Sequence, residues 1–457
     1  MSLKGAFAFR AGGYMRFFSG ICFIKVNVSL EKPKQHDLIS SEALSLGMVD
    51  KIRREFGFIR GNYLILVLSW ILMDFAGELA APYYPEYVRQ LGASESVVGV
   101  IGFVAFMALA SVQFPGGFLA DKYGRKWLVS TLTFGVALSY VFFAVAPTWH
   151  FIMVGTLVAN LCLLYQPALL AMMADSMPPE RRGMGYSIIN LIMSVTTTPA
   201  AAVGLALVVQ YGLVSGLRIG YVIIVVFFLA AATLRLRLKE SVRMNPGKMQ
   251  LSELFSSYPK ALREGIAVWK IVPLSTFFLF VSGLLVRFSF ALSQFIMLFY
   301  ALDVLLISEA IWGLATIALF STMIVFAFPA GKLIDKVGRK IPLVLSLLVL
   351  LPAIYLFIYG DVVRLFISLP LFGIGQLLSM SSYMSLLADL VPRELRGKVI
   401  GSSNFFSYVF MAFGSLAGGV IYQIVSPQLP FLLMIVCIIP ALFLTFFLVH
   451  EPEKREE

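Results

Sequence analysis

Residues 115–126, which read PGGFLADKYGRK, decide the fold of this chain. Long apolar segments lie on both sides of this stretch, so its charged side chains are expected at a membrane surface. The same spacing returns 214 residues later, where residues 329–340 read PAGKLIDKVGRK. The residues that recur at matching positions are Gly117 and Gly331, Asp121 and Asp335, Gly124 and Gly338, and Arg125 and Arg339.

A second motif repeats with the same shift. Residues 174–183 read ADSMPPERRG, and residues 388–397 read ADLVPRELRG. Asp175 and Arg182 of the first copy correspond to Asp389 and Arg396 of the second. Because two unrelated motifs both recur after the same number of residues, the sequence indicates a tandem duplication of one membrane unit.

The composition excludes most classes of soluble protein. The 457 residues are 59% hydrophobic and 13% charged, with a mean hydropathy of +0.88, whereas soluble globular chains carry roughly 25% charged residues. The net charge of +11 does not indicate a nucleic-acid partner, because nearly all basic residues fall in alternate short loops. Three scattered cysteines and three scattered histidines predict no disulfide framework, metal site or cofactor.

Apolar stretches of about 20 residues, the length that a membrane-spanning helix needs, recur along the chain. In the first half we place them at residues 60–84, 97–119, 126–146, 150–173, 185–210 and 218–237. In the second half we place them at residues 271–301, 309–331, 340–360, 363–388, 398–423 and 428–449. The sequence therefore predicts an all-α integral membrane protein with twelve transmembrane helices in two pseudo-symmetric six-helix bundles.

The predicted organisation has five parts. They are an N-terminal extension (1–59), a first six-helix domain (60–237), a linker (238–270), a second six-helix domain (271–450) and a charged tail (451–457). A native start at Met48 is an open alternative to the extension. The basic loops lie on one side of the predicted topology, so both termini are expected to be cytoplasmic in a multi-pass protein of the plasma membrane. Helical apolar spacing in residues 251–268 predicts a linker helix along the inner membrane surface.

Two homologous halves, with G-x-x-x-D-K-x-G-R-K after the second and eighth spans, resemble the major facilitator superfamily of secondary transporters. The resemblance covers about residues 60–450 and is nearest to the branch of drug/proton exporters, although the fifth-helix glycine signature of that branch is only partly present. It implies alternating access, in which two six-helix domains rock about a central site near the middle of the membrane.

The loop motif is expected to form a gate. Gly117 and Gly331 permit close helix packing, and Gly124 and Gly338 suit a tight turn with positive φ. The resemblance implies that Asp121 faces the positive N-terminal end of the eleventh helix. It also implies that Arg125 bridges to Asp175, and the duplication mirrors this with Asp335, Arg339 and Asp389 against the fifth helix. The full set of predicted gating residues is Gly117, Asp121, Gly124, Arg125, Asp175, Arg182, Gly331, Asp335, Gly338, Arg339, Asp389 and Arg396. An alternative is that these charges only anchor the topology.

Three ionisable residues lie inside predicted spans. Asp74 and Glu78 share one helical face because they are four residues apart, and Arg287 lies at about the same depth in the seventh helix. Each charge costs about 2.5–3.5 kcal/mol at a helix centre, so these side chains should face a wet cavity or a partner. We expect Asp74 or Glu78 to carry a coupling proton, with Arg287 switching its affinity. The alternative is a permanent Asp74–Arg287 salt bridge that holds the halves together.

Other polar residues of the spans are expected either to line the cavity or to form hydrogen bonds between helices. They are Gln113, Asn160, Gln166, Asn190, Gln294, Gln376 and Asn404. Several aromatic residues are candidates for stacking on an apolar substrate. They are Trp70, Tyr83, Tyr84, Phe288 and Tyr408.

The leading functional hypothesis is proton-coupled export of lipophilic or cationic small molecules by a monomer in a lipid bilayer. The alternative is an importer or symporter of an organic anion or nutrient, with Arg287 as its counter-charge. A receptor or scaffold derived from a transporter is a third class, although two intact loop motifs argue against it. An enzyme is not expected, because the sequence holds no nucleophile–base set, phosphate-binding loop or metal cluster.

Overall fold

The computed structural model describes residues 57–178, 182–240, 258–259 and 262–451. The predicted N-terminal extension lies outside the described residues except for residues 57–59, and so does the tail beyond residue 451. Most of the predicted linker helix is also outside, but residues 262–267 are helical and run into the 3₁₀ helix η4 (Val268–Lys270).

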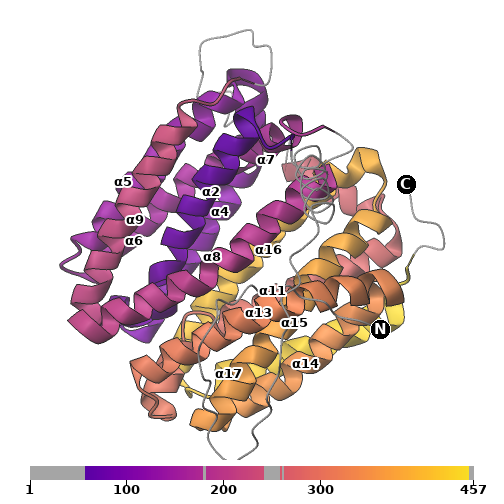
Figure 1. The fold of residues 1–457 in the computed structure, drawn as a ribbon. Helices are drawn as coiled ribbons and strands as arrows, with labels where there is room; N and C mark the ends of the chain where they lie inside the picture. Colours follow the sequence, from indigo (N-terminus) through magenta and orange to yellow (C-terminus); the bar gives the residue numbers. More distant parts are fainter. Residues whose placement is uncertain (1–56, 179–181, 241–257, 260–261, 452–457) are drawn as a thin grey trace, which may run out of the picture. The chain divides into compact units, whose positions relative to one another are not determined.

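Two bundles of helices make up the described chain, one from each half of the sequence (Figure 1). The first half contains α2 (Gly61–Ala80), η1 (Ala81–Tyr83), α3 (Tyr84–Gln90), α4 (Glu95–Tyr123), α5 (Arg125–Ala144), α6 (Trp149–Cys162), η2 (Leu163–Tyr165), α7 (Gln166–Asp175), α8 (Arg182–Tyr211) and α9 (Leu213–Arg235). The second half contains α11 (Leu274–Ser293), α12 (Met297–Phe299), the π-helix η5 (Tyr300–Val304), α13 (Glu309–Val337), α14 (Lys340–Ile358), α15 (Val362–Leu390), α16 (Arg393–Ile424), α17 (Leu429–Phe443) and the π-helix η6 (Leu444–Leu448).

Eleven helical segments among the described residues are long and apolar enough to cross a membrane. The twelfth is α8, which has 30 residues and an apolar C-terminal part, Val195–Tyr211. The two halves meet where α4 packs along α16 and α8 packs along α13. The predicted all-α fold with six spans in each half is therefore confirmed.

Prolines divide two of the predicted spans. The first span was expected as one helix over residues 60–84, but Pro82 is the second residue of the 3₁₀ turn η1 and Pro85 lies in the first turn of α3. The fourth span is divided in the same way ahead of Pro167. Proline has no N–H and restricts the residue before it, so a helix readily restarts at such a position.

The sixth span begins earlier than expected. Its helix α9 starts at Leu213, whereas the sequence placed the start at residue 218. In the structure the Arg218 guanidinium donates a hydrogen bond to the carbonyl oxygen of Ala146 at 2.8 Å. A long basic side chain can thus remain in a spanning helix by reaching a polar partner near its end.

The sequence repeat is also a structural repeat. Ser94 and Ser308 cap the N-termini of α4 and α13 by accepting hydrogen bonds from the backbone N–H groups of the third residues on. At the other end of the same two helices, Gly124 and Gly338 have φ values of 99° and 90°, the left-handed region that favours glycine. The predicted tight turns are present in both halves.

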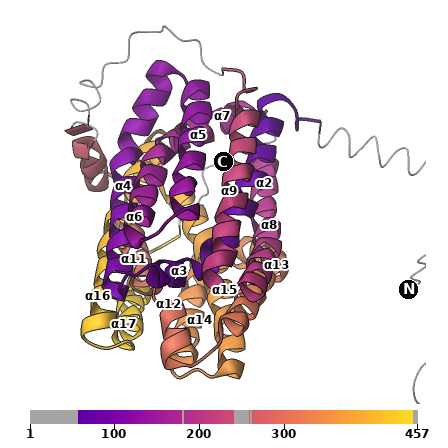
Figure 2. The same cartoon turned by 90° about the vertical axis from the view of Figure 1, so that its left-hand side faces the viewer.

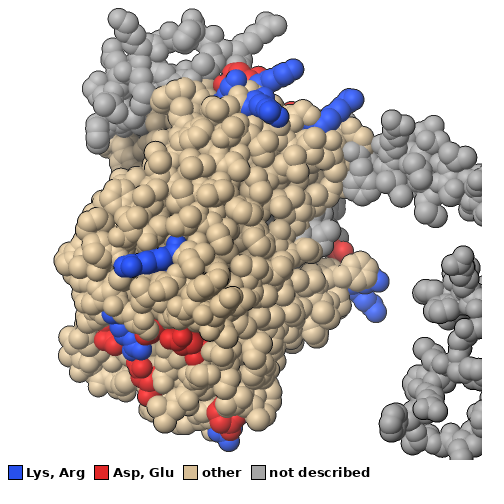
Figure 3. All heavy atoms as spheres, turned by 60° about the vertical axis from the view of Figure 1, so that its left-hand side comes forward, with Lys and Arg blue, Asp and Glu red and all other residues tan. Residues whose placement is uncertain are grey.

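We call the end of the bundles that holds Gly124 and Gly338 the basic end, and the end that holds Arg89 and Asp303 the far end. Figure 2 gives the side view of the helices that connect these two ends. In Figure 3 most of the visible surface is uncharged, and one group of Lys and Arg side chains lies at its top. Exposed Leu, Val, Ile and Phe side chains are numerous along the spans, as expected for a protein surrounded by lipid.

Candidate functional site

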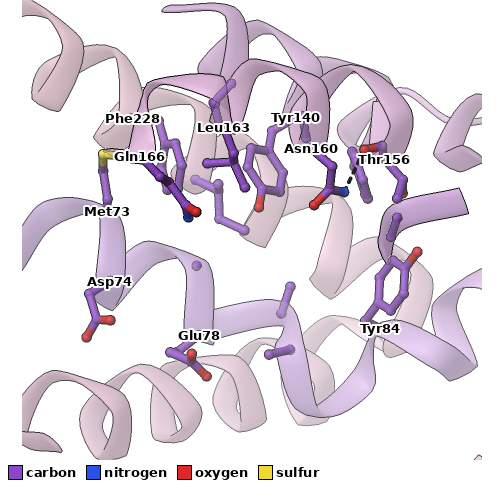
Figure 4. Close-up of a pocket in the computed structure, with 18 of the residues that line it drawn as sticks. Met73, Asp74, Glu78, Tyr84, Tyr140, Thr156, Asn160, Leu163, Gln166 and Phe228 are labelled. Carbon is purple, nitrogen blue, oxygen red and sulfur yellow. Dashed lines mark hydrogen bonds between the residues drawn. The ribbon is translucent and has the colours of Figure 1, made fainter. Parts of the chain in front are cut away.

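A cavity of about 750 Å³ lies mainly within the first half of the chain. The walls come mainly from α2, α5, α6, α7 and α9, and among the described residues the second half contributes Gln294, Phe295, Asn404 and Tyr408. Both intramembrane carboxylates line it from α2, and in Figure 4 they lie across from Gln166, Tyr140 and Asn160. The sequence-based expectation that Asp74 and Glu78 share a face toward a cavity therefore agrees with their position.

The two carboxylates have different surroundings. Asp74 accepts a hydrogen bond from the hydroxyl of Thr196 on α8, so its position is fixed by a neighbouring helix. Glu78 makes no hydrogen bond or ion pair with any residue that the structure describes, and it is half-buried. Glu78 is therefore the carboxylate that remains available to a ligand or a proton.

Aromatic side chains form part of the wall of the same cavity. Tyr140 lies at 5.2 Å from Phe143 and 5.1 Å from Phe228, measured between ring centroids, and Tyr221 lies at 5.2 Å from Phe143. Tyr84 also lines the cavity and points into it in Figure 4. Aromatic faces attract cations and stack on flat apolar groups, so this wall complements the two carboxylates.

Arg287 does not lie beside Asp74. Its guanidinium carbon is 5.8 Å from the centroid of the Tyr383 ring on α15, within the range of a cation–π contact. No ion pair joins Arg287 to a carboxylate among the described residues, and Arg287 does not line the cavity. The alternative of a permanent Asp74–Arg287 salt bridge is therefore wrong for this conformation, because Arg287 stays against an aromatic ring of its own half.

The loop motif forms matched ion pairs in the two halves. Arg125 pairs with Asp175, and Arg339 pairs with Asp389 at 3.1 Å. Each pair joins the start of one helix to the end of another within the same half. Asp335 is exposed and makes no hydrogen bond or ion pair with a described residue, while the side chains of Asp121 and Arg182 lie outside the description. A gating role for the motif remains a prediction.

The motif glycines differ from the expectation in one respect. A Cβ added to Gly331 would have no neighbour within 4 Å, so this glycine does not serve a close helix contact in this conformation. The close approach occurs at Gly116, where a Cβ would lie 2.3 Å from the carbonyl oxygen of Leu164. The side chain of Gly117's neighbour Phe118 lies outside the description, as does the surrounding of Gly117 itself.

The polar candidates fall into three groups. Asn160, Gln166, Gln294 and Asn404 line the cavity. Gln113 lines a second pocket of about 420 Å³, and Gln376 is exposed and lines neither. The side chain of Asn190 lies outside the description. Among the aromatic candidates, Trp70, Tyr84 and Tyr408 line the cavity, whereas Tyr83 and Phe288 do not.

The second pocket connects the cavity to the basic end. It shares Gln166, Leu170, Asn404 and Tyr408 with the larger cavity and extends to Lys398 near the start of α16. At the far end the two halves are in contact: Arg89 pairs with Asp303, and the Trp312 indole donates to the carbonyl oxygen of Pro82 at 3.1 Å. The cavity is thus closed at the far end and continues toward the basic end.

Sequence reasoning missed several residues of the cavity wall, among them Tyr140, Tyr221 and Arg235. Tyr140 and Tyr221 carry no signal in the sequence, since both are aromatic residues of strongly apolar spans. Arg235 falls near the end of the predicted sixth span (218–237) and was not singled out, but it is 1% exposed and lines the cavity from the end of α9. The apolar residues that precede Arg235 in the sequence are the signal that could have placed its charge inside the membrane.

Two helical bundles related by a sequence repeat, with a cavity that is closed at one end, define a transporter of small molecules across a membrane. The family model of the Major Facilitator Superfamily matches residues 66–315 and 279–457. The chain belongs to the Major Facilitator Superfamily. Its relatives are transporters, not enzymes.

Curated relatives include exporters of drugs. The chain is 26% identical over 379 residues to a multi-drug resistance efflux pump PmrA homolog of Lactococcus lactis, covering 79% of this chain and 89% of that protein. It is 30% identical over 137 residues to multidrug resistance protein 1 of Bacillus subtilis, covering 30% of this chain and 35% of that protein. The alignments with two other curated relatives span 32% and 20% of the lengths of those proteins.

Solved structures have the same fold. The human organic anion transporter MFSD10 is 18% identical, with a TM-score of 0.64 over 84% of this chain and 98% of that one. At this level of identity the likeness concerns the fold alone.

Proposed function

We propose that this transporter exports lipophilic or cationic small molecules in exchange for protons. The observation that carries the proposal is Glu78, which has no partner among the described residues and lines an aromatic-walled cavity together with Asp74. A carboxylate in such a place can hold either a proton or a cationic substrate, and competition between the two couples their movements. The drug-exporting relatives in Lactococcus lactis and Bacillus subtilis support the same direction of transport.

The proposed topology has both termini in the cytoplasm of a cell whose plasma membrane holds the protein as a monomer. The basic residues near Gly124 and Gly338 support this orientation, because cytoplasmic loops are rich in Lys and Arg. In that orientation the cavity described above faces inward. Labelling of a single cysteine at the exposed position Lys336 tests it, and reaction with an impermeant reagent from outside the cell would reverse the topology.

Transport of an organic anion or nutrient would need a cation at the substrate. The sequence proposed Arg287 for this role, but Arg287 lies against Tyr383 and does not line the cavity. Arg287 is therefore not placed in this conformation to act as that counter-charge. Arg287→Gln should leave the transport of cations unchanged, and selective loss of anion transport would favour the alternative.

Proton movement in reconstituted vesicles tests the export proposal directly. Wild type, Asp74→Asn and Glu78→Gln are compared with a panel of lipophilic cations and organic anions. We expect cations to drive proton movement in wild type and Glu78→Gln to abolish it. Transport of anions only, with both variants still coupled to protons, would contradict the proposal.

A further inference from the structure

Arg235 is the largest fully buried side chain among the described residues, at 1% exposure. Its Nε donates a hydrogen bond to the Ser69 hydroxyl at 3.0 Å, and its Nη1 donates to the Thr133 hydroxyl at 2.8 Å. The guanidinium carbon lies 5.3 Å from the centroid of the Tyr165 ring. None of these partners carries a negative charge, and no ion pair joins Arg235 to a carboxylate in the part of the chain that the structure describes.

A guanidinium without a counter-charge is costly inside a membrane protein, and such residues face a water-filled cavity or a ligand. Arg235 follows this rule, because it lines the same cavity as Asp74 and Glu78. Its remaining terminal nitrogen, Nη2, has no hydrogen-bond partner among the described residues. The cavity therefore has a cationic wall that offers at least one free donor.

The fold does not need a cation at this place. By the 214-residue repeat, the partners Ser69 and Thr133 correspond to Gly283 and Leu347, and Arg235 itself corresponds to the buried Val449. In the second half the neighbouring helices are joined by a hydrogen bond between the hydroxyls of Ser282 and Thr445, at 2.7 Å. Uncharged side chains thus pack at the equivalent place in the second half, so packing alone does not explain the charge of Arg235.

We infer that Arg235 binds a carboxylate of the substrate, so that the cavity accepts zwitterionic compounds with an amine at Glu78 or Asp74 and an acid at Arg235. The amine half of this inference rests on the proposed function, and the acid half does not. Along α2, Asp74 and Glu78 lie five and nine residues beyond Ser69, a rise of roughly 7.5 and 13.5 Å. A rigid aromatic compound with its two charges on the order of 10 Å apart fits this span.

The test uses the purified full chain and four biphenyl probes, with binding measured by titration calorimetry. The probes are 4′-(aminomethyl)biphenyl-4-carboxylic acid, its methyl ester, the amine without a carboxyl group, and biphenyl-4-carboxylic acid. Wild type should bind the amino acid roughly 10- to 100-fold more tightly than the ester, the range expected for hydrogen bonds to a charged group. Arg235→Gln should remove this ratio and keep the affinity for the ester.

Arg237→Gln is the matched control, because Arg237 lies two residues further on and is exposed, and it should keep the wild-type ratio. Arg235→Lys retains the charge without the two-pronged geometry and should give an intermediate ratio. A ratio near one in wild type, or an unchanged ratio in Arg235→Gln, would overturn the inference. The comparison of the amino acid with its ester in wild type tests the inference even if the glutamine variant fails to fold.

The probes also separate this inference from the proposed function. If wild type binds the two acids through Arg235 but not the simple amine, the export of cations is contradicted and the acid site stands. If the amine binds and the carboxyl group adds nothing, the export proposal stands and the acid site is refuted. Failure of every probe to bind would contradict both.

Discussion

Asp74 and Glu78 lie one turn apart on α2, yet only one of them is held by the protein. Thr196 donates its hydroxyl hydrogen to Asp74, whereas Glu78 has no such partner among the described residues. A carboxylate that is held in place by a neighbouring helix can orient a substrate, and a carboxylate without a partner can exchange a proton more freely. This difference predicts that Asp74 serves substrate binding and that Glu78 serves proton coupling.

Thr196→Val tests the role of the hydrogen bond to Asp74. The variant removes the donor and keeps the shape, so the affinity for a lipophilic cation should fall by about 10-fold while proton coupling through Glu78 persists. Affinity is measured by calorimetry and coupling by proton movement in vesicles. Thr198→Val is the control, because the Thr198 hydroxyl on the same helix is buried without a hydrogen-bond partner. Equal effects of the two variants would show that the hydrogen bond to Asp74 has no role in binding.

The residue scale also marks the limit of sequence reasoning about the site. Asp74 and Glu78 were predictable, because charge in an apolar span is rare and their spacing defines a helical face. Arg235 was not, because it lies at the end of its helix, where a basic residue usually flanks a span. Its burial depends on Ser69 and Thr133 of two other helices, and these contacts cannot be read from the local sequence.

At the scale of elements, residues 264–269 of the linker are fastened to α16. The Ser402 hydroxyl donates to the carbonyl oxygen of Gly265 at 2.6 Å and accepts from the Trp269 indole at 2.8 Å. Lys398 pairs with Glu264 at 3.2 Å on the exposed side. The linker also meets the first half, since the Tyr258 ring lies 6.1 Å from the ring of Phe114 on α4. The linker therefore touches both halves beside the second pocket.

Ser402→Ala should loosen this attachment. Ser402 is fully buried, so the variant leaves the Gly265 carbonyl and the Trp269 indole without their partner, at a cost of about 1–3 kcal/mol. Hydrogen exchange should accelerate in residues 262–270 more than in the spans. Ser407→Ala is the matched control, since the Ser407 hydroxyl on the same helix is buried without a hydrogen-bond partner. Unchanged exchange in the linker of Ser402→Ala would mean that other contacts hold it.

The crossing of α4 and α16 closes the far end. A Cβ on Gly419 would lie 2.6 Å from the carbonyl oxygen of Glu95 and 2.9 Å from the Cα of Gly99, so only glycine fits between these backbones. Gly419→Ala should therefore hinder closure at the far end and increase the labelling of a cysteine placed at Ser96. Gly401→Ala on the same helix is the control, because a Cβ there has no neighbour within 4 Å. Equal labelling of the two variants would contradict the role of this crossing.

At the scale of the whole molecule, the duplication made the fold predictable. Six spans in each half and the turns at Gly124 and Gly338 follow from the repeated motifs. The far-end contact was not predicted, although it joins equivalent positions: Arg89 and Asp303 are 214 residues apart and form an ion pair. The repeat places the two positions on either side of the pseudo-symmetry axis, but their pairing depends on which end of the molecule is closed. A sequence specifies all conformations of a transporter but does not show which of them is the most populated.

The two ends of the molecule are expected to move in a coupled way. In alternating access, opening of the far end accompanies closure of the basic end, so Gly419→Ala should change two distances in opposite directions. Spin labels at the exposed far-end positions Tyr211 and Tyr359 should move apart. Labels at the exposed basic-end positions Arg237 and Lys336 should move together. A receptor or scaffold that does not rock would keep both distances.

Asp335 is expected to stabilise the closed basic end. It is exposed and makes no ion pair with a described residue in this conformation, and on closure of the basic end its carboxylate would meet the N-terminus of α8, an interaction of about 0.3–1 kcal/mol. Adding Asp335→Asn to Gly419→Ala should therefore shift part of the population back, by about two- to fivefold, which appears as a longer distance between the labels at 237 and 336. Asp361→Asn is the control, because Asp361 caps α15 at the far end and asparagine caps as well. Identical distance distributions with and without Asp335→Asn would mean that the charges of the loop motif anchor the topology and do not act as a gate.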